Sequence, residues 1–560
     1  MKEKFPHLYF LFKRLLLVYL IFTLLRFIFF IFNWNTFSNI SSQQLFKAFQ
    51  IGLLFDTSAI SYIFGIVILM HVLPISFRSN KHYQYVLKWV FICGVFISVL
   101  LNLIDVGYFP FIGKRSGVEL FKMQSTQNAS LLIYVFSYWY LFVILIALLL
   151  LTWYLYPSFS NKGEGKKKPN MLIETLVFIV VCVLTFFGAR GSFGLKPLNT
   201  MDAATYVNPI LTPLTVNTPF AIFLSLDQSG LEEKKYYSSN VINALNLTQH
   251  ITDNNSTNIG KNVVLIIVES LGKEYVSGYN NKKGFTPFID SLMQVSTVYT
   301  NAYANSKRSI EGIPAIISAM PSWMSGDYIN SFYQTNTLHS LGYYLTKQGY
   351  DCSFYHGGKN GTMNFDKFVA QTEFGKYYGL NEYPKQEDFD GNWGIPDEPY
   401  LQYWANELNT KKEPFMSTVF TLSSHHPYTL PVTVKDKFKG GSLPIHATIE
   451  YVDFALQQFF EKAKKQPWFA NTVFILTSDH SSENIEPYYQ TMQGRYAVPL
   501  LIYNPNESKF KTIEKTTDQL QIMSIILNEV SKPSMKYFSF ANDYAIQYTG
   551  GVYQLINYPY

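Results

Sequence analysis

Carboxylate and imidazole side chains fall where predicted β-strands end in the second half of the chain. Glu269 and Asp479 each lie at the end of a mainly apolar run, VVLIIVES and TVFILTSD. Ligand sites in open sheets of parallel strands form beyond the carboxyl ends of the strands, so we expect the side chains at such positions to gather at one edge. The residues at or just after the ends of four predicted strands are Glu269, Ser270, His356, His425, His426, Asp479 and His480.

These residue types are suited to metal-dependent chemistry. Glutamate, aspartate and histidine together suit a divalent ion with mixed oxygen and nitrogen ligands, such as Mn²⁺, Zn²⁺ or Mg²⁺. Ser309 directly precedes a predicted helix, IEGIPAIISAM. A hydroxyl beside a bound cation loses its proton readily, and a helix N-terminus favours the alkoxide and an incoming anion. The combination predicts attack on a phosphate ester, although singly Ser309 could be an N-cap and Glu269 could pair locally.

A mainly parallel sheet would position these groups. From about residue 261, short β-branched apolar runs alternate with helical patterns, which is typical of a sheet covered by helices on both faces. The predicted strands are residues 263–270, 351–356, 415–424, 472–479 and 498–504, and the predicted helices are residues 286–294, 310–320, 337–349, 397–409, 445–465 and 517–530.

The first third of the chain is strongly apolar. Of the 560 residues, 48% are hydrophobic and only 15% are charged, which excludes a disordered chain and a highly charged nucleic-acid binder. A helix needs about 20 apolar residues to cross the bilayer, and no signal-peptide cleavage site follows the first run. We therefore predict a transmembrane domain of five helices in residues 1–190. The apolar runs are residues 15–33, 51–76, 86–108, 131–155 and 171–189.

Basic residues indicate the orientation. They gather before the first run, in the second loop and in the fourth, which places the N-terminus in the cytoplasm. Five crossings then put everything after residue 190 outside, as a membrane-proximal linker (191–260) and a catalytic domain (261–560). We expect Arg26 to snorkel and Asp56 to lie near an interface. The basic residues concerned are Lys2, Lys4, Lys13, Arg14, Arg78, Lys81, Lys88, Lys162, Lys166, Lys167 and Lys168; Lys114, Arg115 and Lys122 in the third loop fit the pattern less well.

Four segments together resemble the lipoteichoic acid synthase family, which are membrane-anchored phosphoglycerol transferases of the alkaline phosphatase and sulfatase superfamily. The family also has five spans followed by an extracytoplasmic catalytic domain, so the resemblance covers nearly the whole chain. The segments are VVLIIVESLGKEYVSGYNNKKGFTPFIDSL, NAYANSKRSIEGIPAIISAMPS, SSHHPYTLP and FILTSDHSS.

The resemblance implies a role for each matching residue. Glu269, Asp479 and His480 match the family's metal ligands. Ser309 matches the nucleophile, which is usually threonine in the synthases, and would be a fourth metal ligand. His425 matches a histidine that holds the phosphate or glycerol end of the substrate.

The chain departs from the family pattern at the substrate. Where the synthases have a Trp-Asn-Arg stretch that binds phosphoglycerol, residues 363–365 are Met-Asn-Phe, so the family's anion-binding arginine is missing. We expect Lys359 or Arg308 to replace it, with His356 as a further substrate-binding candidate. The sequence after Ser309 is Ile-Glu-Gly-Ile and lacks the Cys/Ser-x-Pro-x-Arg pattern of sulfatases, which argues against sulfatase activity.

The resemblance implies a phosphotransferase of the bacterial cell (inner) membrane, multi-pass, with an extracytoplasmic catalytic domain. It would move a phosphoglycerol-type head group from a phospholipid donor to an envelope glycan or glycolipid through a phospho-seryl intermediate. One divalent cofactor is expected, Mn²⁺ first, with Mg²⁺ or Zn²⁺ as alternatives, and no nucleic-acid partner.

Two alternatives stay open. One is a phosphoethanolamine transferase acting on a glycolipid or surface glycan; its lipid A-modifying members commonly carry ectodomain disulfides, which the single ectodomain cysteine, Cys352, cannot form. The other is a non-catalytic envelope-binding protein with a hydrolase-like domain.

Overall fold

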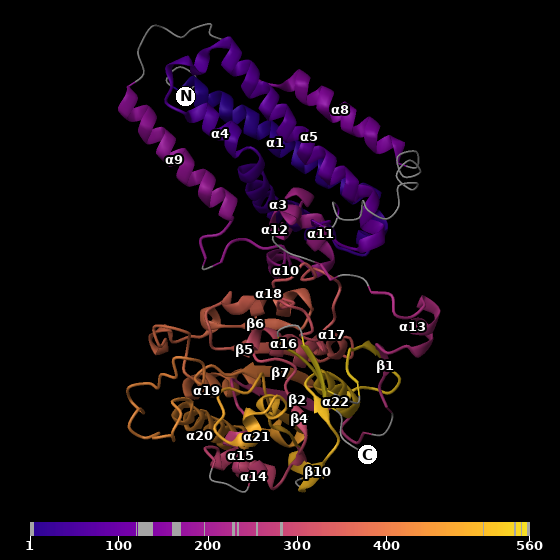
Figure 1. Cartoon of the computed structure of the whole chain (residues 1–560), viewed down its shortest axis with the longest axis vertical. Helices are drawn as coiled ribbons and strands as arrows, with labels where there is room; N and C mark the ends of the chain where they lie inside the picture. The colour runs from indigo at the N-terminus through magenta and orange to yellow at the C-terminus, as the bar shows by residue number, and fades with distance from the viewer. Residues whose placement is uncertain are drawn as a thin grey trace. The chain divides into compact units, whose positions relative to one another are not determined.

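The computed structural model divides the chain into two compact units, Met1–Gly230 and Leu231–Tyr560, shown in Figure 1 and called here the N-terminal and C-terminal units. Each is described by itself. The residues that the structure describes are 5–118, 120, 138–158, 170–194, 196–226, 230–231, 234–253, 256–280, 284–507, 509–542, 545–549 and 552–556.

Apolar helices make up most of the N-terminal unit. Within its described residues, three helices are long and apolar enough to cross a membrane, α1 (Pro6–Phe32), α5 (Lys81–Ile112) and α9 (Met171–Arg190). The pair α3 (Ser42–Ile63) and α4 (Gly65–Val72), bent by 68°, would make a fourth span if counted as one. Five spans were predicted. The fourth predicted run gives α8 (Trp139–Leu155), which has 17 residues.

Part of the topology prediction lies outside the described residues. The start of the fourth run, residues 131–137, lies outside them. So do seven of the basic residues used for orientation, Lys2, Lys4, Lys122, Lys162, Lys166, Lys167 and Lys168. Residues of the predicted linker instead belong to this unit, since its short helices contact α3 and α5. These helices are α10 (Asp202–Tyr206), α11 (Thr212–Thr215) and α12 (Thr218–Ser225); α2 (Trp34–Phe37) precedes α3.

Two buried arginines hold the segment 213–216 inside the N-terminal unit. Arg26 forms a two-pronged ion pair with Asp56, both bonds being 2.7 Å, and also donates to the carbonyl oxygens of residues 214 and 215 at 3.0 and 3.1 Å. Arg115 donates to those of residues 213 and 216 at 2.7 and 3.1 Å, and lies 4.0 Å from Asp105. The prediction that Arg26 snorkels is therefore wrong, because its guanidinium has internal partners and is buried.

A mixed eight-stranded sheet forms the centre of the C-terminal unit, in the order β10-β3-β9-β8-β2-β7-β5-β6. Every pairing is parallel except those of β9, which runs against β8 and β3. The strands are β2 (Asn262–Val268), β3 (Thr297–Tyr299), β5 (Asp351–His356), β6 (Lys376–Tyr378), β7 (Phe415–Phe420), β8 (Thr472–Ser478), β9 (Leu500–Tyr503) and β10 (Lys511–Ile513).

Three two-stranded ribbons accompany this sheet. They pair β1 (Gln249–Ile251) with β12 (Lys536–Phe538), β4 (Ala302–Tyr303) with β11 (Thr517–Asp518), and β13 (Ala545–Thr549) with β14 (Val552–Ile556). Short helices of the unit include α13 (Ser239–Leu245), α14 (Ser277–Asn280), α18 (Phe365–Gln371) and α21 (Pro487–Gln490).

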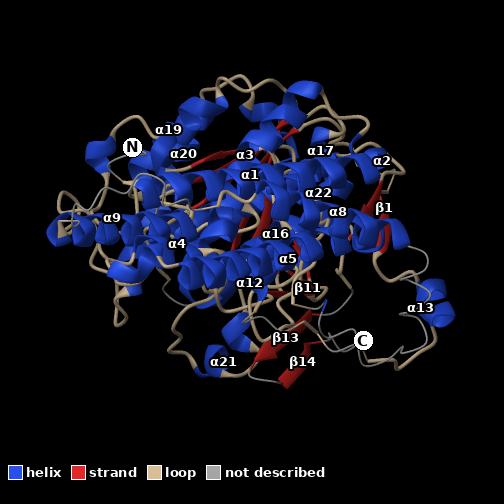
Figure 2. Cartoon of the chain, turned by 90° about the horizontal axis from the view of Figure 1, so that it is seen from above, coloured by secondary structure: helices blue, strands red, loops and turns tan. Residues whose placement is uncertain are grey.

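Helices bury both faces of β2, the strand between β7 and β8. All seven residues of β2 are buried. Val264 and Ile266 join a cluster with Trp404 and Phe459, so the alternation of side chains turns Leu265 toward the opposite face. One group of contacting helices is α15 (Pro287–Met293), α19 (Asp397–Leu408) and α20 (Ile445–Ala463); the other is α16 (Ser309–Ser318), α17 (Leu341–Thr346) and α22 (Leu520–Val530). Figure 2 shows the strands among these helices.

The sheet is therefore mainly parallel and flanked by helices, as the sequence predicts, with β9 as its antiparallel member. The four neighbouring strands β8, β2, β7 and β5 run parallel, so their carboxyl ends meet at one edge. The chain leaves β2 at Glu269 and β8 at Asp479, next to each other in the register. This edge positions the candidate site.

Candidate active site

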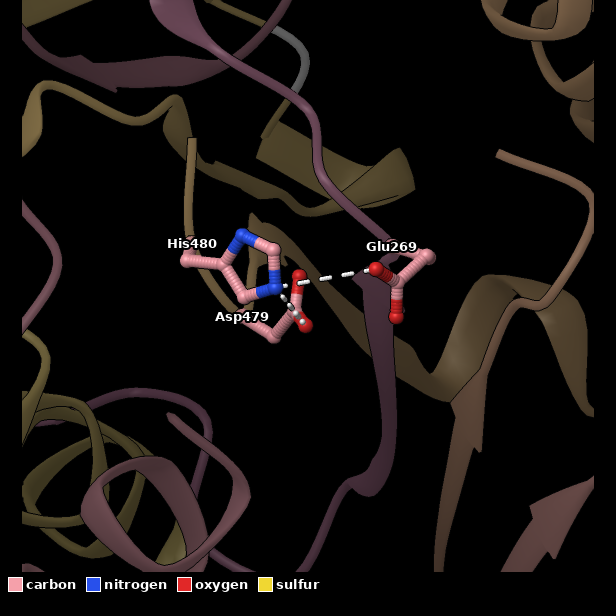
Figure 3. Close-up of side chains that lie close together, drawn as sticks. All are labelled: Glu269, Asp479 and His480. Atoms are coloured by element: carbon pink, nitrogen blue, oxygen red, sulfur yellow. Dashed lines mark ion pairs between the residues drawn. The ribbon is translucent and has the colours of Figure 1, made fainter. Parts of the chain in front are cut away.

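Glu269, Asp479 and His480 converge just beyond the ends of β2 and β8 (Figure 3). Each offers one ligand atom, and these atoms all lie within 4.8 Å of one another. His480 Nε2 is 3.2 Å from Asp479 Oδ2 and 3.6 Å from Glu269 Oε1. The three residues are buried, so they form a compact site with two oxygen ligands and one nitrogen ligand.

The electrostatics of this cluster fit a divalent cation. His480 Nδ1 donates to the Ser481 carbonyl oxygen at 3.0 Å, which leaves the Nε2 lone pair facing the carboxylates, as in a metal ligand. Asp479 Oδ2 is buried and accepts no hydrogen bond from the described residues. Burial, and then the charge of Asp479, raises the pKa of the Glu269 carboxyl well above its usual range. A cation would relieve this repulsion and use the unpaired oxygen.

Ser309 is the first residue of α16, and its hydroxyl faces the cluster. Its Oγ donates to Glu269 Oε2 at 3.1 Å and lies 3.3 Å from His480 Nε2. The N-cap position belongs to Arg308, so the serine hydroxyl is not used as a helix cap. A hydroxyl oxygen thus lies at a helix N-terminus beside two candidate metal ligands, where the helix dipole favours an alkoxide.

Two hydroxyl residues, Ser270 and Thr421, help to orient the carboxylates. No role was predicted for either from the sequence. Ser270 donates through Oγ to Glu269 Oε1 at 2.7 Å and through its backbone N–H to Asp479 Oδ1 at 2.9 Å. To do so it adopts φ 58°, a left-handed conformation that costs about 1–3 kcal/mol for a non-glycine residue. Thr421 Oγ1 accepts the backbone N–H of Glu269 at 2.9 Å. The only available signal was that each hydroxyl residue follows a strand.

The predicted substrate-binding histidines lie at the same sheet edge. His425, in the loop after β7, donates from Nδ1 to the His426 carbonyl oxygen at 2.8 Å, and its ring lies 4.1 Å from that of Trp393. Burial lowers the pKa of His425, opposed by that hydrogen bond and by Asp479. His426 contributes its carbonyl oxygen here, which also accepts Trp393 Nε1–H at 2.9 Å.

His356 is a buried, neutral imidazole at the end of β5. Its Nδ1 donates to the Phe420 carbonyl oxygen at 3.1 Å, and burial lowers its pKa to about 4. Its ring stacks on Phe420 with centroids 4.8 Å apart. Because the proton is on Nδ1, the other ring nitrogen can only accept a hydrogen bond.

The predicted substitutes for the missing arginine have protein partners. Arg308 pairs with Glu311 in the first turn of α16, and its side chain is 57% exposed. Lys359 places its ammonium 4.7 Å above the Phe389 ring. Lys307, the neighbour of Arg308, is also held by the protein. Its ammonium donates to the carbonyl oxygens of residues 481 and 495 at 2.8 and 2.9 Å, and burial lowers its pKa to about 8. The anion-binding roles of Arg308 and Lys359 stay predictions.

The part of the chain that holds this site is similar to known proteins. The sequence model of the sulfatase family matches residues 261–529, which contain the whole cluster and Ser309. Lipoteichoic acid synthase 1 of Bacillus subtilis is 25% identical over 308 residues, covering 51% of this chain and 48% of that synthase. The lipoteichoic acid synthase of Staphylococcus saprophyticus is 22% identical over 533 residues, covering 86% and 77%. The chain thus spans about half the length of several relatives that it matches.

Among solved structures, a lipoteichoic acid synthase from Listeria monocytogenes, LtaP, superposes with a TM-score of 0.46 at 16% identity, over 52% of this chain and 78% of that one. A Vibrio parahaemolyticus protein of the alkaline phosphatase superfamily gives a TM-score of 0.48 at 24% identity, over 55% and 77%.

Proposed function

We propose, because residues 261–529 form a sulfatase-family domain with lipoteichoic acid synthases among its relatives, that this chain is a membrane-bound, metal-dependent phosphotransferase. It would transfer a phosphoglycerol-type head group from a phospholipid to a glycan or glycolipid on the outer side of the membrane. The observation that carries the proposal is the position of Ser309 Oγ, within 3.1 Å of Glu269 and 3.3 Å of His480.

Glu269, Asp479 and His480 would hold the divalent ion, with Ser309 Oγ at the fourth position. When bound, the ion supplies positive charge that lowers the pKa of the serine hydroxyl and stabilises the phosphoryl oxygens. Mn²⁺ is our first choice, and Mg²⁺ or Zn²⁺ would also accept this mixed donor set.

The transfer would proceed in two displacements. Ser309 Oγ gives up its proton and attacks phosphorus; a new O–P bond forms, the bond to the diacylglycerol oxygen breaks, and that oxygen takes a proton as diacylglycerol leaves. An acceptor hydroxyl then attacks phosphorus: a new O–P bond to the acceptor forms, the bond from phosphorus to Ser309 Oγ breaks, and the serine oxygen takes the proton that the acceptor hydroxyl gives up. We propose that His425 orients the phosphate or takes part in proton transfer to the leaving oxygen, for which its ring would first have to be protonated.

Mass spectrometry of the active-site peptide tests this proposal. After the purified full chain is incubated with Mn²⁺ and either phosphatidylglycerol or phosphatidylethanolamine, we expect Ser309 to carry the added head group, and the added mass identifies phosphoglycerol or phosphoethanolamine. The Ser309→Ala variant should lose both the adduct and diacylglycerol release while retaining Mn²⁺ binding. Wild-type diacylglycerol release by Ser309→Ala would reject the assignment, and an unmodified Ser309 with both lipids would favour a non-catalytic binding protein.

A further inference from the structure

The side-chain amide of Gln519 joins the two parts of the candidate site. Its Nε2 donates to the carbonyl oxygens of Ser478 at 2.6 Å and Asp479 at 2.7 Å, at the end of β8. Its Oε1 accepts the backbone N–H of Asn305 at 2.8 Å, on the segment that leads into α16. One buried side chain therefore bonds both the strand end that carries a candidate ligand and the segment that carries Ser309.

These two parts lie in direct contact beside Gln519. A Cβ added to Gly312, one turn into α16, would lie 2.4 Å from the Asp479 carbonyl oxygen. The helix that begins at Ser309 thus packs against the same carbonyl that Gln519 binds. A small shift of that peptide would move the helix and the ligand relative to each other.

Gln519 is itself firmly held. Its backbone N–H donates to the Tyr303 carbonyl oxygen at 3.1 Å, next to the pairing of β11 with β4. The preceding residue, Asp518, is buried and accepts both bonds from Asn305 Nδ2, at 3.1 and 3.2 Å. Asn305 Oδ1 in turn accepts the Ser322 N–H at 2.7 Å. The amide therefore links two segments from a fixed point.

We propose that Gln519 is a positioning residue that sets the distance between Ser309 and the cluster of Glu269, Asp479 and His480. The position requires an amide, because it needs two N–H donors for neighbouring carbonyls and one oxygen acceptor for a backbone N–H. Glutamate supplies the acceptor without the donors, and methionine supplies neither. The expected effect of Gln519 on turnover rests on the proposed function. Its expected effect on cation affinity rests only on the metal site.

The test compares Gln519→Met with Gln521→Met in the full-length protein. Gln521 lies two residues further on, in the first turn of α22, and its amide also donates to a carbonyl, that of Asn542. Loss of a partner that orients a metal ligand typically costs about 10- to 100-fold in metal affinity or activity. We expect Gln519→Met to lower Mn²⁺ affinity and the kcat of diacylglycerol release by about that factor, with KM for phosphatidylglycerol within about twofold, and Gln521→Met to keep wild-type values.

A second variant covers the case in which Gln519→Met does not fold. Gln519→Glu keeps the shape and the acceptor but turns an oxygen toward the two carbonyls, so its Mn²⁺ affinity should fall in the same way. Wild-type Mn²⁺ affinity in either folded variant would overturn the inference. If the wild-type protein binds Mn²⁺ but Ser309 never carries an added head group, the proposed function fails. The comparison of Mn²⁺ affinity between the wild type and the Gln519 variants still decides the role of Gln519.

Discussion

Two carboxylates that face each other in a buried site are the residue-level feature from which the chemistry follows. Glu269 and Asp479 have few counter-charges among the described residues around them: Ser270 bonds both, and His480 has turned its lone pair toward them. Such a pair is stable when a cation binds between its members. Two carboxylates at this distance therefore favour a bound cation, and the fold has brought them together.

The Glu269→Gln variant tests this requirement. The amide keeps the size of the side chain but removes the charge of a ligand. Mn²⁺ affinity should therefore fall by more than the factor of about 10 to 100 that is expected when a residue that only orients a ligand is lost. Mn²⁺ at about 100 times its dissociation constant should stabilise the wild-type chain by about 2.7 kcal/mol, a gain that EDTA removes. Calorimetric titration and thermal unfolding measure both effects. Glu461→Gln, an exposed change on α20, is the control, and equal Mn²⁺ affinity in the two variants would contradict the metal assignment.

Single residues divide into those that the sequence could predict and those that it could not. Glu269, Asp479 and His480 were predictable because each follows a strand that apolar runs identify, and strand ends of a parallel sheet meet. Gln519 was not predictable, since it lies at the start of a predicted helix and its partners are far away in the sequence. Ser478 and Asp479 are about 40 residues before it, and Asn305 is more than 200 residues before it. Only the fold brings such groups together.

At the scale of elements, a long-range contact takes the place of a local cap at one helix, α15. The N-cap of α15, Thr286, makes no side-chain capping bond. Asp453 on α20 instead accepts the N–H groups of Phe288 and Ile289 at 2.8 and 2.9 Å. A carboxylate at this end complements the helix dipole, but burial raises the pKa of Asp453 to about 7.

This pKa predicts a pH dependence of stability. The folded-state pKa of Asp453 lies above the ordinary value of 3.8, so between these two pH values the folded chain binds more protons than the unfolded chain. By linkage, stability falls as pH rises from about 4 to 7. Asp453→Asn should make this decline shallower in thermal unfolding across pH 5–8. Asp436→Asn, which changes an exposed carboxylate, should keep the wild-type slope, and an unchanged slope in Asp453→Asn would refute the explanation.

A second element-level prediction concerns the buried pair Arg26–Asp56. Asp56→Asn leaves the Arg26 guanidinium without its counter-charge, and breaking one partner of a buried pair typically costs about 3–5 kcal/mol. We expect a correspondingly lower free energy of unfolding in detergent, followed by circular dichroism. Lys47→Gln, an exposed change on the same helix, should have little effect. Removal of both charges in Arg26→Met with Asp56→Leu should destabilise less than Asp56→Asn, and the reverse order would reject the pair as the cause.

Strand length explains which elements the sequence could predict. The runs that became β2, β5, β7, β8 and β9 have four to seven residues each and are rich in apolar or aromatic side chains, and all were predicted. The missed strands of the main sheet, β3, β6 and β10, have three residues each, too few for a periodic pattern. The helix predicted at 337–349 is shorter in the structure, Leu341–Thr346, because Ser340 caps it by accepting the N–H of Tyr343.

At the scale of the whole molecule, the remaining prediction is topology. The proposed donor is a membrane lipid, so the side of the bilayer on which the catalytic domain lies matters. The basic residues of the first third of the chain mark the cytoplasmic side, which predicts that the catalytic domain lies outside. In a chain with Cys93→Ser and Cys182→Ser, we expect Val432→Cys, at a position 91% exposed, to react with a membrane-impermeant maleimide in intact spheroplasts. His82→Cys, predicted to be cytoplasmic, should react only after permeabilisation. The opposite pattern would place the site in the cytosol.

The segment at residues 213–216 also determines what can change around it. Arg26 and Arg115 grip four consecutive peptide oxygens there, and every amino acid carries such an oxygen. The arginines therefore recognise the path of the main chain and are indifferent to the identity of the side chains along it. We expect relatives of this protein to differ in sequence at residues 213–216, provided that the new side chains fit the same space. We expect them to keep arginine at positions 26 and 115.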